Sequence, residues 1–134
     1  MQPTVIDKAY RFVPPHKGSF WPRLARLWLK PFLRRAYGIE AVELRGVERL
    51  RASLAAGHGV ALTPNHCRPC DAMVMGLLGQ EVGRPFFYMA SWRLFMQGRL
   101  RAWWLNRLGC FSVYREGADR EALRALAMAA KAHV

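Results

Sequence analysis

A histidine and an aspartate five positions apart, His66 and Asp71, are the residues of this chain best suited to acid–base chemistry. On one continuous helix they would point about 140° away from each other, because each residue turns the helix by roughly 100°. Across a strand-to-helix turn they can meet. Pro69 suits the first helical position, and Asp71 would then lie in the first turn, where the helix dipole favours its ionised form. The aspartate could orient one imidazole nitrogen while the other accepts a proton from a hydroxyl. A purely structural turn is the alternative interpretation.

The elements expected around this pair alternate between strands and helices. Apolar runs and helical periodicity predict strands at residues 41–44, 59–63, 85–90 and 110–114, and helices at 19–38, 47–56, 69–79, 91–108 and 119–134. Such alternation requires crossover connections, so we expect an α/β fold with a mostly parallel sheet. The pair would then follow the carboxyl end of a buried strand, where open α/β sheets bind ligands. Because the last helix has neither a glycine cap nor a following strand, we expect this domain to be incomplete at the C-terminus.

Three regions follow from the composition. Residues 1–18 form a proline-rich extended arm, and residues 39–134 form the N-terminal part of the α/β domain. Residues 19–38 form a basic amphipathic helix, which Pro31 should kink or split. The aromatic and basic side chains of this helix include Trp21, Trp28, Phe32, Arg26 and Lys30. This composition favours a membrane-interfacial helix whose cations meet lipid phosphates. A solvated basic face over a core contact is the alternative.

The chain carries a strong positive charge. Its 21 Lys and Arg against 9 Asp and Glu give a formal net charge of +12 and a pI near 10.8. A polyanionic partner is implied, either nucleic acid or an anionic membrane surface. No apolar run suits a signal peptide or a bilayer span, so we expect the chain to stay cytosolic or to lie on a membrane. Of these two locations we favour peripheral association with the cytoplasmic face of a membrane.

The three cysteines indicate reduced thiols, because their number is odd and no export signal precedes them. Cys67 and Cys70 form a CxxC pair, but a structural zinc site needs four ligands, usually from two pairs. A redox loop is another use of such a pair, and no thioredoxin-like strand pattern precedes it. We therefore expect inert thiols, with no metal and no bound cofactor.

Two sequence blocks resemble a known family. Asn65-His66 with Asp71 resembles the NHxxxxD motif of the glycerolipid acyltransferase superfamily, which contains the lysophosphatidate (1-acylglycerol-3-phosphate) and glycerol-3-phosphate acyltransferases. Residues 109–115, Gly-Cys-Phe-Ser-Val-Tyr-Arg, resemble the second block of that family, a glycine, an apolar strand and an arginine. The resemblance covers about residues 20–134. A third block, a Phe-Pro-Glu-Gly-type turn, is not in this sequence, and Tyr114 stands where the family often carries an acid.

The resemblance implies transfer of a fatty acyl group from acyl-CoA or acyl carrier protein to the hydroxyl of a lysophospholipid such as lysophosphatidate, in phospholipid biosynthesis. His66 would take the proton of the attacking hydroxyl, and Asp71 would fix the imidazole tautomer. Arg115 would hold the phosphate of the acceptor, because its planar fork matches two oxygens. The remaining substrate contacts would come from Asn65, Arg68 and Phe111.

Two alternatives to a working acyltransferase stay open. A basic nucleic-acid-binding module would account for the charge and for aromatic residues interleaved with arginine, but it leaves His66 and Asp71 unexplained. An inactive acyltransferase fragment would keep the membrane affinity without turnover. We favour the enzyme, with an anionic phospholipid surface, a lysophospholipid acceptor and an acyl donor as partners, and no nucleic acid.

The predicted helix at 91–108 is rich in aromatic residues, which are Trp92, Phe95, Trp103 and Trp104. We expect them mainly in the core, with acyl-chain or membrane contact as the alternative.

Overall fold

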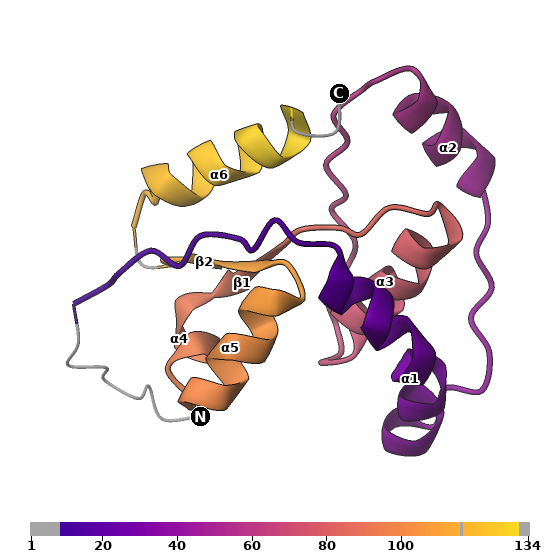
Figure 1. Cartoon of the computed structure of the whole chain (residues 1–134), viewed down its shortest axis with the longest axis horizontal. Coiled ribbons are helices and arrows are strands. Elements are labelled where there is room, and N and C mark those ends of the chain that lie inside the picture. Colours follow the sequence, from indigo (N-terminus) through magenta and orange to yellow (C-terminus); the bar gives the residue numbers. More distant parts are fainter. Residues whose placement is uncertain (1–8, 116, 132–134) are drawn as a thin grey trace.

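The computed structural model describes residues 9–115 and 117–131. Within these residues the chain is mostly helical, with six helices and one small parallel sheet (Figure 1). The elements in chain order are α1 (Phe20–Tyr37), α2 (Val47–Ala55), α3 (Asp71–Glu81), β1 (Tyr88–Ser91), α4 (Trp92–Phe95), α5 (Arg99–Arg107), β2 (Cys110–Val113) and α6 (Arg120–Lys131). Five predicted helical segments are therefore helical, although residues 132–134 of the last one lie outside the described residues.

The sheet consists of β1 and β2, which pair in parallel with Tyr88 opposite Cys110 and Ser91 opposite Val113. Helices α4 and α5 form the crossover between them, as the expected α/β connection requires. The predicted single helix at 91–108 is wrong in one respect, because it is interrupted at Gly98. This residue has φ 136 and ψ 146, a backbone conformation essentially restricted to glycine. The break lets the crossover turn back toward the start of β2.

The strands predicted at residues 41–44 and 59–63 are wrong. Both segments are irregular, and four of the five residues in 59–63 are exposed. A strand needs a neighbour that accepts and donates its backbone hydrogen bonds, and within the described residues β1 and β2 pair only with each other. The apolar run 59–63 therefore lacks a strand partner. The expected sheet is reduced to two strands, and His66 follows an irregular segment instead of a strand.

The arm, residues 9–18, lies beside β2 (Figure 1). The Ser112 N–H donates to the Val13 carbonyl at 3.0 Å, and the Val13 N–H donates to Ser112 Oγ at 2.8 Å. Further along, Asn106 Nδ2 of α5 donates to the Pro14 carbonyl at 2.7 Å. The arm therefore bonds to β2 without forming a third strand of the sheet. Residues 1–8 of the predicted arm lie outside the described residues.

Tyr10 joins the arm, β2 and α6. Its hydroxyl donates to Asp119 Oδ2, and its ring stacks on Tyr114 with 5.1 Å between centroids. Asp119 also accepts from the backbone N–H of Tyr114 and of Ala122, both at 2.9 Å, and so stabilises the first turn of α6. Burial, followed by the bond to Asp119, raises the pKa of Tyr10 to about 12.

The core that positions the candidate site lies between α1 and α3. Leu29 and Leu33 of α1 pack with Leu77 of α3 and with Cys70, the residue that precedes α3. Helix α1 is not split at Pro31, and it ends at Gly38, whose φ of 66 is the left-handed conformation that glycine adopts at helix ends. Because Cys70 belongs to this core, the turn carrying His66 is fixed against α1.

Candidate active site

The structure brings His66 and Asp71 together at the start of α3. Nδ1 of His66 lies 3.3 Å from Oδ2 of Asp71, the first residue of the helix. The intervening residues form the turn that the five-residue spacing requires, and buried Cys70 anchors its end in the α1–α3 core. The predicted contact therefore forms, although the segment before it is not a strand.

Backbone groups of the same turn hold the Asp71 carboxylate in place. Its Oδ2 accepts the N–H of Cys67 at 2.7 Å and the N–H of Arg68 at 2.8 Å. The pKa of Asp71 is lowered, first by the Arg68 N–H, then by the Cys67 N–H and by His66, while partial burial opposes them. Bonds to a charged acceptor favour its ionised form. Asp71 is therefore a fixed anion at neutral pH.

His66 keeps one ring nitrogen available for chemistry. Its Nδ1 faces the ionised Asp71, so the neutral imidazole carries its proton on Nδ1 and its lone pair on Nε2. The side chain is 69% exposed, so the ring is accessible from solvent. Such an arrangement suits a general base that accepts a proton at Nε2 while a carboxylate stabilises the resulting imidazolium.

Two of the predicted substrate-contacting residues lie next to the pair. Asn65 and Arg68 belong to the same turn and both are exposed. The bond from Arg68 to Asp71 comes from the backbone N–H of Arg68, so the guanidinium takes no part in it. A cation and an amide therefore lie on the same exposed turn as the imidazole.

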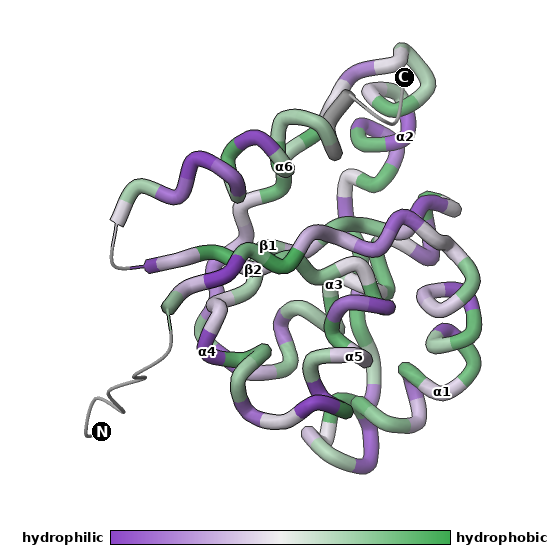
Figure 2. Tube along the Cα trace, turned by 60° about the vertical axis from the view of Figure 1, so that its left-hand side comes forward, coloured by the Kyte–Doolittle hydropathy of each residue, from purple (hydrophilic) through white to green (hydrophobic). Residues whose placement is uncertain are grey.

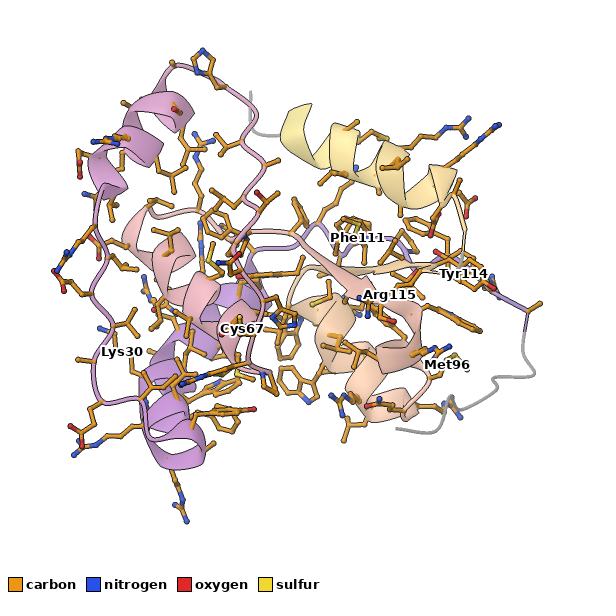
Figure 3. All side chains as sticks on the ribbon, turned by 180° about the vertical axis from the view of Figure 1, so that it is seen from behind. Lys30, Cys67, Met96, Phe111, Tyr114 and Arg115 are labelled. Atoms are coloured by element: carbon orange, nitrogen blue, oxygen red, sulfur yellow. The ribbon has the colours of Figure 1, made fainter. Side chains whose placement is uncertain are left out.

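The other two predicted substrate-contacting residues lie elsewhere. Phe111 is completely buried in β2, so its side chain packs in the core and offers no surface to a ligand. Arg115 is exposed just after β2, beside Tyr114 and away from Cys67 (Figure 3). Among the described residues, no hydrogen bond or ion pair joins Arg115 to His66 or Asp71. The second sequence block is thus not assembled with the first.

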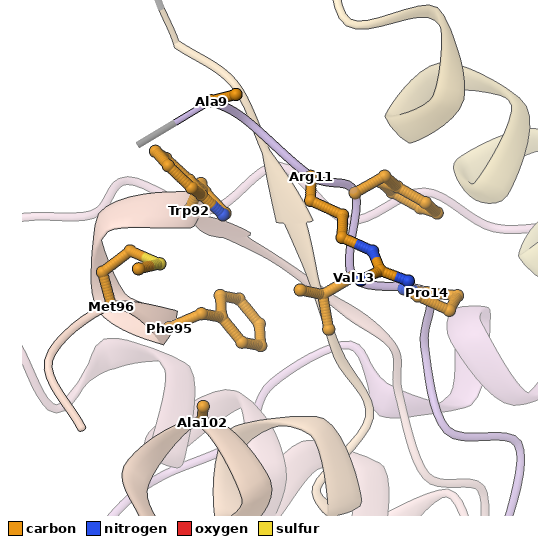
Figure 4. Close-up of a pocket in the computed structure, with 9 residues that line it drawn as sticks. Ala9, Arg11, Val13, Pro14, Trp92, Phe95, Met96 and Ala102 are labelled. Carbon is orange, nitrogen blue, oxygen red and sulfur yellow. The ribbon is translucent and has the colours of Figure 1, made fainter. Parts of the chain in front are cut away.

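A surface pocket of about 440 Å³ lies apart from the pair, between the arm and α4–α5 (Figure 4). Its walls include Val13 from the arm, Trp92 and Phe95 from α4, and Ala102 from α5, with Arg11 as its charged residue. Sequence analysis missed this pocket. The spacing of Trp92 and Phe95 indicates an apolar helix face, but nothing in the sequence shows that the arm covers it.

The cysteines occupy two different environments. Cys67 is exposed on the turn, whereas Cys70 and Cys110 are buried. Burial raises the pKa of the Cys110 thiol to about 12, which keeps it protonated. Within residues 9–115 and 117–131, no three His, Cys, Asp or Glu side chains form a group able to hold a metal ion.

Four of the five side chains of α1 that were predicted to meet a membrane are exposed. Trp28, Phe32, Arg26 and Lys30 are exposed, whereas Trp21 is half-buried. No helix in the described part of the chain is both long and apolar enough to cross a bilayer. The aromatic residues of the crossover divide as well: Trp92 and Phe95 are buried, Trp104 is half-buried and Trp103 is exposed.

No protein-family model, curated protein or solved structure matches the chain. The geometry of the His66–Asp71 turn and the resemblance of its residues to a known motif therefore carry the functional proposal.

Proposed function

We propose that the chain transfers a fatty acyl group from a thioester to the hydroxyl of a lysophospholipid, with His66 as general base. The donor is acyl-CoA or acyl carrier protein, and the acceptor is of the lysophosphatidate type, as in phospholipid biosynthesis. One observation carries the proposal: an exposed imidazole lies 3.3 Å from a carboxylate that two backbone N–H groups hold in place. The acyltransferase-like character and the lipid substrate rest on the sequence resemblance.

The reaction follows from the chemistry of the pair. As the acceptor oxygen attacks the thioester carbonyl carbon, Nε2 of His66 takes the hydroxyl proton, and Asp71 stabilises the imidazolium. The tetrahedral intermediate then expels the thiolate, which recovers that proton from His66. An ester and a free thiol result, and His66 returns to its neutral form. A positioned base of this kind contributes about a hundred- to ten-thousand-fold to the rate.

Arg68 is the cation that the turn itself supplies. It lies on the turn of His66 and is exposed, and a guanidinium binds two phosphate oxygens at once. It would hold a phosphate of the acceptor or of coenzyme A. Asn65 would donate from its amide on the same turn. A role for Arg115 in holding the phosphate of the acceptor rests on the resemblance alone, since this residue lies after β2.

A membrane surface with anionic phospholipid is the proposed location, on its cytoplasmic face. The net charge of +12 favours such a surface, and Trp28 and Phe32 are exposed on the helix that carries Arg26 and Lys30. Because Leu29 and Leu33 of this helix pack with Cys70, the His66 turn is fixed to the helix that would lie on the membrane.

The test replaces His66 by glutamine in the full chain and follows ester formation from acyl-CoA and lysophosphatidate by mass spectrometry. Loss of the base should reduce kcat by at least about a hundredfold. The control is His58→Gln, because His58 is also exposed but lies earlier in the connection between α2 and α3, outside the turn that holds Asp71. Full turnover by the His66 variant would contradict the proposal. Tight salt-dependent oligonucleotide binding without vesicle binding would favour a nucleic-acid-binding module instead.

A further inference from the structure

Helix α1 exposes an apolar face in addition to its buried one. Phe20, Leu24, Leu27 and Trp28 are exposed, and Leu27 is 74% exposed. With roughly 100° per residue, the centre of this face lies about 150° around the helix from Leu29 and its buried neighbours. Apolar side chains therefore cover nearly opposite sides of α1. Helix α3 packs on the buried side, whereas the four apolar side chains of the other side stay exposed among the described residues.

The exposed face continues from α1 onto α5 through a contact of aromatic rings. Trp21 meets Trp103 with 5.1 Å between ring centroids and Trp104 with 5.4 Å, each edge-on, and Phe20 contacts Trp21 at 5.3 Å. On α5, Leu100 is 72% exposed and lies one turn before Trp103, on the same side of the helix. Two elements distant in sequence thus form one surface.

Positive charge borders this surface, and acidic residues are absent from both helices. Helix α1 carries five basic residues and α5 carries three, with no Asp or Glu in either sequence. The guanidinium of Arg107 lies 5.5 Å from the ring centroid of Trp103. Figure 2 shows hydrophobic and hydrophilic residues interleaved along α1. Apolar and aromatic groups bordered by cations match the boundary between acyl chains and anionic headgroups.

We infer that α1 and α5 together form one docking surface for an anionic phospholipid bilayer, called here the α1–α5 face and defined by Phe20, Leu24, Leu27, Trp28, Leu100 and Trp103. This inference rests on the membrane location in the proposed function and deepens it, because it names the surface and adds α5. Leucine and aromatic side chains enter the headgroup boundary while the neighbouring cations bind lipid phosphates. The bilayer thereby covers the apolar side chains of α1 that are exposed among the described residues.

Helix α6 offers the strongest competing surface. It exposes Leu123, Leu126 and Met128, but its sequence includes Glu121. Within the described part of the chain, no aromatic contact like that of Trp21 with Trp103 joins α6 to a second helix. Leu123 is 60% exposed, a fraction similar to the 72% of Leu100, and therefore provides a matched site for substitution.

The test is co-sedimentation of the full chain with vesicles of phosphatidylcholine and phosphatidylglycerol in equal parts. Leu27→Ser on α1 and Leu100→Ser on α5 should each weaken binding about tenfold, because each removes one inserted leucine. Leu123→Ser should change binding less than twofold. Pure phosphatidylcholine vesicles should bind much more weakly than the mixed ones. His66→Gln should bind like the unchanged chain, so a failed transfer reaction and a failed docking surface are told apart.

A second measurement locates the aromatic residues. Phospholipids with brominated acyl chains should quench part of the tryptophan fluorescence, and Trp103→Phe should reduce the quenched part. Trp92→Phe should not, because Trp92 is buried against the arm. Unchanged vesicle binding by Leu100→Ser would overturn the inference. A loss of vesicle binding in Leu123→Ser as large as in Leu27→Ser and Leu100→Ser would also overturn it. A dimer of this chain that Leu27→Ser dissociates, without vesicle binding, would also overturn it.

Discussion

Leu33→Ala should destabilise the chain strongly and disturb the candidate site from a distance. Leu33 is 1% exposed and belongs to the cluster in which α1 packs on α3. Truncation removes its buried methyl groups and leaves a cavity that the two helices cannot close completely. For such a fully buried leucine, the free energy of unfolding should fall by roughly 3 to 5 kcal/mol. Domains of this size are stable by only about 5–15 kcal/mol, so the loss is a large part of the total.

Urea unfolding followed by circular dichroism measures this loss as a shift of the midpoint. The matched control is Leu27→Ala on the same helix, which removes the same atoms from a side chain that is 74% exposed. Its free energy of unfolding should stay within about 0.5 kcal/mol of that of the unchanged chain. Equal effects of the two substitutions would refute the packing of α1 on α3.

A second readout connects this core to the site. The backbone N–H groups of Cys67 and Arg68 bond to Asp71, one residue beyond Cys70 in the shared core. Loosening the core should let the turn open more often. Amide hydrogen exchange at Cys67 and Arg68 should therefore be faster in Leu33→Ala than in Leu27→Ala. Unchanged exchange would mean that the turn holds the acid–base pair without help from the α1–α3 core.

The remaining predictions concern the arm and the crossover. Because the pKa of Tyr10 is raised from 10.0 to about 12, its hydroxyl stabilises the fold fully below pH 10 and loses this contribution as the pH rises to about 12. Thermal unfolding over this pH range should show the loss in the unchanged chain and a smaller loss in Tyr10→Phe. Gly98→Ala should lower the free energy of unfolding by about 1–3 kcal/mol, because φ 136 is strained for alanine. Gly117→Ala, which has only ordinary contacts and no positive φ, should cost less than about 0.5 kcal/mol. Equal costs for the two glycine substitutions would contradict the assigned backbone geometry.

Local patterns predict the helices and the His66 turn well. The α1 pattern, its Gly38 end and the meeting of His66 with Asp71 depend on residues close in sequence, and the structure shows all three. The two parallel strands and their helical crossover are also predicted, because the crossover follows directly from the alternation of elements.

Features that depend on distant partners are not predicted. The apolar run 59–63 looks like a strand, but whether it pairs depends on neighbours that the run itself does not specify. The bond from Tyr10 to Asp119 joins residues 109 positions apart, and no local signal reveals it. Trp103 is a large aromatic residue of the kind expected in a core, yet its side chain is exposed beside Trp21. Periodicity shows which residues share a helix face, but not what covers that face.

The most direct test of the central claim is a double-mutant cycle on the acid–base pair. The kcat/KM for acyl transfer from acyl-CoA to lysophosphatidate is measured for the unchanged chain, His66→Gln, Asp71→Asn and the double variant. If the pair acts as one unit, each single change should lower kcat/KM by at least about a hundredfold, and the double variant should lose little more than His66→Gln alone. Losses that multiply in the double variant, or an Asp71→Asn variant with full activity, would contradict the account.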